Sequence, residues 1–134
     1  MILFVCHANL NRSPRAAALF RRLAEGMGLD VEVISAGITS EPHFDSETLK
    51  MVWGIKERIK LTNDLLHRAE LVFVLDKRVL GEIVHNFSDP PEGIINLGIP
   101  DHFSLSRGNF DEFDRILEER LTPELNKLTG KERL

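Results

Sequence analysis

A cysteine and an arginine lie six residues apart near the start of the chain, in the segment Cys6-His7-Ala8-Asn9-Leu10-Asn11-Arg12-Ser13-Pro14. The segment joins an apolar run at residues 2–5, typical of a buried strand, to a stretch with helical periodicity. A turn of this kind can point several backbone N–H groups at one spot, and the helix N-terminus adds a partial positive charge. Because Arg12 can add a bidentate guanidinium, the pattern predicts an oxyanion cradle with the Cys6 sulfur at its base.

Such a cradle favours the thiolate, which is the nucleophilic form of cysteine. A thiolate beneath a bound phosphoryl group is placed for in-line attack, which forms a phosphocysteine intermediate. We expect Ser13 to hydrogen-bond the sulfur and help it leave, and Asn9 to brace the loop. The alternative interpretation is a buried free cysteine with a surface arginine nearby.

Apolar runs alternate along the chain with amphipathic stretches, as an α/β fold requires. Strands are predicted at residues 2–5, 31–34, 71–75 and 94–97, helices at 13–27, 45–53, 77–87 and 109–128, and a short helical turn at 62–68. Ser13 is expected to cap the first helix, with Pro14 at its first position. Strands that are apolar throughout predict a parallel sheet with helices on both faces, within a single domain over residues 1–134.

The run from Val5 to Pro14 resembles the signature of low-molecular-weight protein tyrosine phosphatases, V-C-x-G-N-x-C-R-S-P. Further similarity lies in Ser35-Ala36-Gly37 and in the residues from Ala69 to Asp76; it is sharp over residues 2–14 and looser elsewhere. The resemblance implies a three-layer, flavodoxin-like fold with a four-stranded parallel sheet. It also implies Cys6 as nucleophile, Arg12 as phosphate clamp, residues His7 to Ser13 as the phosphate-binding loop, and Asn9 and Ser13 in support.

Two residues of the loop depart from the family signature. Ala8 replaces the usual glycine, which is acceptable only where that residue keeps a negative φ. Asn11 replaces the second cysteine, and this removes the neighbouring thiol that could trap an oxidised Cys6 as a disulfide.

A general acid is expected where the chain leaves the fourth predicted strand. Sites of parallel sheets lie beyond the carboxyl ends of the strands, which favours Asp101 over Asp89. The family's Asp-Pro-aromatic pattern appears here as Asp101-His102-Phe103, with histidine in place of proline, and Phe103 is the expected aromatic wall for a substrate ring. Asp76 is expected either to orient the acid loop or Arg12, or to cap the helix that follows it.

Composition excludes several classes of protein. With one cysteine and no histidines at ligand spacing, the chain is predicted to have no intramolecular disulfide, no metal and no cofactor. No apolar run is longer than six residues, so neither a membrane span nor a signal peptide is expected, and a cytoplasmic location is predicted. The net charge of −4 argues against nucleic-acid binding, although the first 24 residues carry four arginines and no acid.

The predicted function is hydrolysis of phosphotyrosine, or of other aryl phosphomonoesters, on a phosphorylated protein or a small molecule. Three alternatives stay open. One is arsenate reduction with an external thiol, since the thioredoxin-coupled form needs several cysteines of its own. The others are a phosphocysteine carrier and a non-catalytic phosphate-binding module.

Overall fold

The computed structural model describes residues 1–6, 12–38, 59–99 and 110–129. The strands in this part of the chain are β1 (Ile2–Cys6), β2 (Val33–Gly37), β3 (Leu71–Val74) and β4 (Ile95–Asn96). The helices are α1 (Arg12–Gly26), α3 (Asn63–Arg68), α4 (Lys77–Asn86) and α5 (Phe110–Thr129). The predicted helix at 45–53 lies outside the described residues.

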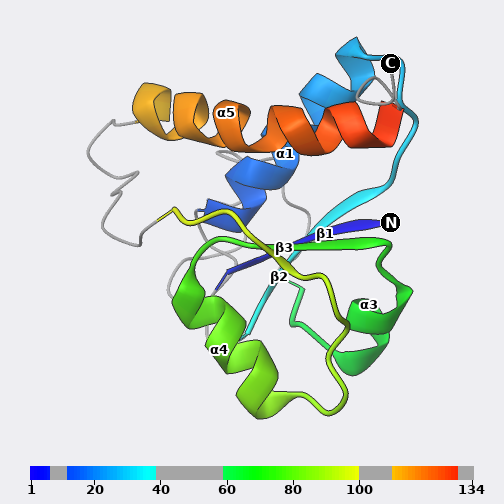
Figure 1. The fold of residues 1–134 in the computed structure, drawn as a ribbon, viewed down its shortest axis with the longest axis vertical. Helices are drawn as coiled ribbons and strands as arrows, with labels where there is room; N and C mark the ends of the chain where they lie inside the picture. Colours follow the sequence, from blue (N-terminus) through cyan, green and yellow to red (C-terminus); the bar gives the residue numbers. More distant parts are fainter. Residues whose placement is uncertain (7–11, 39–58, 100–109, 130–134) are drawn as a thin grey trace.

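The strands form one parallel sheet in the order β2-β1-β3-β4. Helices α1 and α5 cover one face of it, and α3 and α4 cover the other (Figure 1). This strand order is that of flavodoxin-like folds, in which the connection from β2 to β3 crosses over β1. The three-layer, flavodoxin-like α/β fold expected from the sequence is therefore confirmed.

Strand β1 is buried on both faces, and its side chains alternate between two cores. Ile2 and Phe4 pack with the α1 and α5 residues, whereas Leu3 and Val5 pack with those of α3 and α4. This alternation follows from the two-residue period of a strand. It places Cys6 on the face covered by α1, with a side chain that is only 4% exposed.

Three phenylalanines fix α1 against the sheet. The rings of Phe4 and Phe73 stack with centroids 4.9 Å apart, and Phe20 of α1 meets Phe4 edge-on at 5.5 Å. All three side chains are fully buried. Aromatic pairs in these arrangements contribute beyond the area they bury, so this cluster helps to set where the first turn of α1 lies relative to β1.

Strand β2 runs further than its sequence pattern predicted. The prediction was 31–34, but the strand occupies Val33–Gly37, and Gly37 pairs with Cys6 at the end of β1. Small residues such as Ala36 lack strong strand propensity, yet pairing with a central strand and complete burial override that preference. The other described elements fall within about two residues of their predicted bounds, as is usual for helix and strand ends.

Helix α5 crosses α1 and continues through a proline. Its buried stripe consists of Phe113, Leu117, Leu121 and Leu125. Pro123 removes one backbone N–H from the helix, and the hydroxyl of Thr122 donates to the Glu118 carbonyl at 2.7 Å. The long apolar stripe therefore keeps the helix on the sheet despite the interruption.

Candidate active site

Cys6 is the last residue of β1, one of the two central strands. The chain leaves β1 toward β2 on one side of the sheet and later returns to β3 on the other. In sheets of this topology, ligands bind beyond the carboxyl ends of the strands at which the direction switches. The predicted nucleophile therefore lies at the position that the topology favours for a site.

The sulfur of Cys6 lies 2.9 Å from the Oγ of Ser13, and both side chains are buried. Among the residues whose exposure is described, Ser13 is the one polar residue that is buried, and its exposed fraction is 0%. When Cys6 is a thiolate, the serine hydroxyl is the donor in this pair. The contact expected between these two side chains is present.

The predicted capping role of Ser13 is wrong. Helix α1 begins at Arg12, so Ser13 lies inside its first turn, and its hydroxyl meets the Cys6 sulfur. Pro14 is still tolerated there, because the first four N–H groups of a helix have no partner within the helix. The helix N-terminus is consequently brought to the sulfur, where its partial positive charge favours an anion.

The turn itself, His7 to Asn11, lies outside the described residues, and so does the side chain of Arg12. What the structure gives is its two ends, Cys6 on β1 and Ser13 on α1, held together across the 2.9 Å contact. These two residues are seven positions apart along the chain. The roles predicted for Ala8, Asn9, Leu10 and Arg12 stay predictions.

The chain leaving β4 reaches the same edge. Leu75 donates its N–H to the Val5 carbonyl at 3.2 Å, and Ile99 donates to the Leu75 carbonyl at 2.7 Å. Cys6, Leu75 and Ile99 therefore follow one another across the sheet, with about 5 Å between neighbouring strands. Asp101, His102 and Phe103 lie outside the described residues, but Asp101 is only two residues beyond Ile99.

The two other aspartates considered from the sequence are both described. Asp76 caps α4, since its Oδ1 accepts from the Val79 N–H at 3.0 Å. Asp89 lies between the end of α4 and the start of β4, with a left-handed φ of 50°. Because β4 runs parallel to β1, the segment that enters it is at the amino edge of the sheet, away from Cys6.

Over residues 1–133, the sequence matches the family described as low molecular weight phosphotyrosine protein phosphatase. The chain belongs to this family. The resemblance noted from the loop is thus confirmed, and family membership makes the chain a phosphatase-type enzyme.

Relatives within the phosphatase family differ in the substrate that their names state. The protein-arginine-phosphatase of Bacillus subtilis (strain 168) is 38% identical over 82 residues, which is 55% of this chain and only 54% of that protein. A probable low molecular weight protein-tyrosine-phosphatase of Ralstonia nicotianae, EpsP, is 30% identical over 128 residues, covering 87% of this chain and 86% of that one. The crystal structure of a YwlE mutant from Bacillus subtilis has a TM-score of 0.74 at 29% identity, covering 96% and 97% of the two chains.

Two contacts near the phosphatase site could not be read from the sequence. Arg15 of α1 binds Asp114 of α5 through two hydrogen bonds, and Arg120 of α5 binds the chain that leaves β4. Arg15 and Asp114 are 99 residues apart, and the periodicity of apolar residues does not predict contacts at that separation.

Within the described ranges, no cluster of histidine, cysteine and acidic side chains could hold a metal ion, and no helix is long and apolar enough to cross a membrane.

Proposed function

We propose that this phosphatase hydrolyses aryl phosphomonoesters, phosphotyrosine among them, through a phosphocysteine intermediate on Cys6. The observation that carries the proposal is the buried Cys6 sulfur, hydrogen-bonded to Ser13 at the first turn of α1. A cysteine held only for packing needs no buried hydroxyl against its sulfur. A nucleophile that must also depart as a leaving group gains from one, since the donor stabilises negative charge on sulfur.

The first step is attack of the Cys6 thiolate on phosphorus. The S–P bond forms while the P–O bond to the aryl group breaks, and Asp101 gives its proton to the departing oxygen. Arg12 and the N–H groups of the loop bind the non-bridging phosphoryl oxygens. In the second step, Asp101 takes a proton from water, the water oxygen attacks phosphorus, and the sulfur leaves as a thiolate stabilised by Ser13.

Phosphotyrosine and phosphoarginine are the two protein substrates to be separated. Phosphotyrosine is the first choice, because an aromatic wall at Phe103 suits a flat ring. Phosphoarginine is the second candidate, because a relative of 38% identity is named a protein-arginine-phosphatase. A structure of the YwlE arginine phosphatase carries a phosphorylated active-site serine in a cysteine-to-serine mutant, which supports covalent transfer to the position that Cys6 occupies here.

The proposal is tested by steady-state hydrolysis of p-nitrophenyl phosphate, followed by phosphotyrosine and phosphoarginine peptides at matched sequence. Cys6→Ser should abolish turnover while vanadate or phosphate binding survives. Activity of this variant equal to the wild type would refute the mechanism. Preference for the phosphoarginine peptide would reassign the substrate and leave the nucleophile in place.

The position of the acid is tested by a matched pair of aspartates. Asp101→Asn should slow hydrolysis of phenolic esters, whereas Asp89→Asn, at the opposite edge of the sheet, should not. The reverse result would identify Asp89, on the connection from α4 to β4, as the acid in place of Asp101.

The same assays separate the alternative functions. A chain that binds phosphate but hydrolyses no ester would favour the non-catalytic module, and one that transfers its phosphoryl group only to a protein acceptor would favour the carrier. Arsenate reduction that requires an added thiol would favour the reductase.

A further inference from the structure

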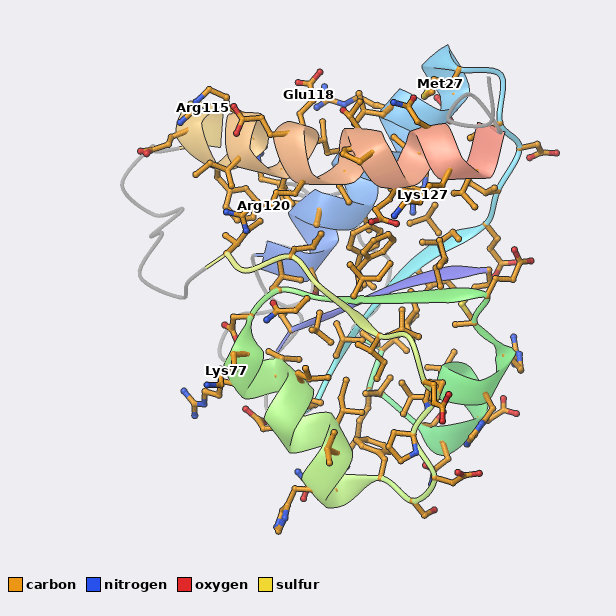
Figure 2. The ribbon with its side chains drawn as sticks, viewed as in Figure 1. Met27, Lys77, Arg115, Glu118, Arg120 and Lys127 are labelled. Atoms are coloured by element: carbon orange, nitrogen blue, oxygen red, sulfur yellow. The ribbon has the colours of Figure 1, made fainter. Side chains whose placement is uncertain are left out.

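A guanidinium from α5 holds the chain at the point where it leaves β4. Arg120 donates from Nη1 to the carbonyls of Leu97 and Gly98, the latter at 3.2 Å (Figure 2). Gly98 has a φ of +66°, and a Cβ at this position would lie 2.7 Å from the same Nη1. Its own N–H donates to the Asn96 side chain at 2.8 Å. The guanidinium thus occupies the space that any side chain at residue 98 would need.

A second contact joins the start of α5 to the start of α1. Arg15 donates from Nε and Nη2 to the two carboxylate oxygens of Asp114, at 2.8 and 2.7 Å. Each side chain is 25% exposed, so the pair is partly shielded from water. A bidentate pair of this kind fixes orientation as well as distance, because both planes are rigid.

These two contacts flank the segment 100–109, which contains the proposed acid. The segment follows Ile99, one residue past the glycine that Arg120 holds, and Phe110, the first residue of α5, comes directly after it. The same helix therefore holds both ends of the segment. Through Asp114 it is also tied to α1, two residues beyond the Ser13 that contacts the Cys6 sulfur.

We propose that Arg120 and the Arg15–Asp114 pair are positioning residues that set the distance between the acid Asp101 and the Cys6 sulfur. The inference rests on the proposed function, since it assumes Asp101 as the acid. A general acid must come within hydrogen-bond reach of the leaving oxygen, and a displacement of 1 Å can cost about 100-fold in rate. None of the three side chains needs to touch substrate for this effect.

The test exploits leaving groups that need the acid to different degrees. Phenolate leaves slowly without a proton, whereas p-nitrophenolate leaves readily without one. Arg120→Met, Arg15→Met and Asp114→Asn should each lower kcat/KM for phenyl phosphate by about tenfold or more, with kcat/KM for p-nitrophenyl phosphate changing by less than about threefold. The value of kcat/KM is compared because it reports only the steps up to departure of the aryl oxygen, whereas kcat also contains the phosphocysteine hydrolysis that both substrates share. Inhibition by inorganic phosphate should stay near the wild-type value, because the phosphate-binding loop is untouched.

Arg115→Met is the matched control, because Arg115 lies on the same helix and its ion pair with Glu119 is exposed. It should leave the ratio of the two kcat/KM values unchanged. In the double variant Arg15→Met, Asp114→Asn the loss should equal that of either single variant, as expected for groups that act as one unit. Arg120→Lys and Arg15→Lys carry the same test if a methionine variant fails to fold.

Equal losses for both substrates, or no loss for either, would overturn the positioning role while the proposed function stands. Additive losses at Arg15 and Asp114 would overturn the paired role. If Arg115→Met changed the ratio as much as the other variants do, the change would not be specific to the two contacts, and the positioning role would be overturned. A wild-type chain without Cys6-dependent hydrolysis would overturn the proposed function first, and this inference with it.

Discussion

Deleting the Ser13 hydroxyl is the most direct probe of the site, because the structure places it 2.9 Å from the Cys6 sulfur. Ser13→Ala removes one oxygen atom from a position with no exposure to solvent, while Cys6 itself is 4% exposed. Bulk water therefore cannot replace the lost donor. We expect the variant to fold, because alanine is a good helix former and fits where serine did.

The size of the effect follows from the charge on sulfur. A hydrogen bond to a charged group is worth about 1.5–3 kcal/mol, and each 1.36 kcal/mol is tenfold in rate, so a loss of about 10- to 150-fold is expected. The loss should fall mainly on hydrolysis of the phosphocysteine, where the thiolate departs. In the attack step the same bond stabilises the starting thiolate, so its removal partly cancels there.

Rapid mixing with p-nitrophenyl phosphate separates the two steps. The variant should release one equivalent of p-nitrophenol in a burst and then turn over slowly, as phosphocysteine accumulates. Thr122→Val is the control, because it deletes a hydroxyl that is hydrogen-bonded at 2.7 Å on the exposed side of α5. A folded Ser13→Ala variant with kcat within about twofold of the wild type, well below the hydrogen-bond estimate, would refute the role given to this contact.

Three further outcomes are expected. Gly98→Ala should lower the free energy of unfolding in denaturant titrations by more than the about 1–2 kcal/mol that its positive φ costs, because the new Cβ also meets Arg120; with Arg120→Ala in the background, the loss should fall to that value, and an unchanged loss would contradict the clash. Asp76→Ala should cost about 1 kcal/mol of stability, because it loses the hydrogen bond to the Val79 N–H. Asp76→Asn should retain both stability and kcat. A fall in kcat alone would show that the carboxylate charge contributes to catalysis as well as to capping. Phe73→Ala should lower the free energy of unfolding by about 3–5 kcal/mol, and a loss below about 1 kcal/mol would contradict the packing role of its ring.

Much of the fold could be predicted because its signals are local. A strand buried on both faces is apolar throughout, and Ile2 to Val5 are all fully buried in the structure. In α5, apolar residues at helical spacing, Phe113, Leu117 and Leu121, are likewise the buried ones. Strand β2 was misplaced because Ser35, Ala36 and Gly37 become a strand only through pairing with β1.

The site divides in the same way. The spacing of Cys6 and Arg12 predicted a phosphoryl-binding loop, and the rule for parallel sheets ranked Asp101 above Asp89. The contact between Cys6 and Ser13 was anticipated, but the position of Ser13 inside α1 was not. Whether Ser13 caps the helix or lies in its first turn depends on a shift of one or two residues in where the helix begins. Sequence patterns do not determine helix ends that closely.

The sequence by itself determined which residue can be a nucleophile, in which turn it lies and what kind of sheet carries that turn, because each depends on residues close together along the chain. Only the tertiary structure decided that Arg15 meets Asp114 and that Arg120 meets Gly98, at separations of 99 and 22 residues. Those contacts exist because α1 and α5 pack on the same face of the sheet. Chain order does not state which helices share a face; the crossover from β2 to β3 and the burial of the apolar stripes decide it.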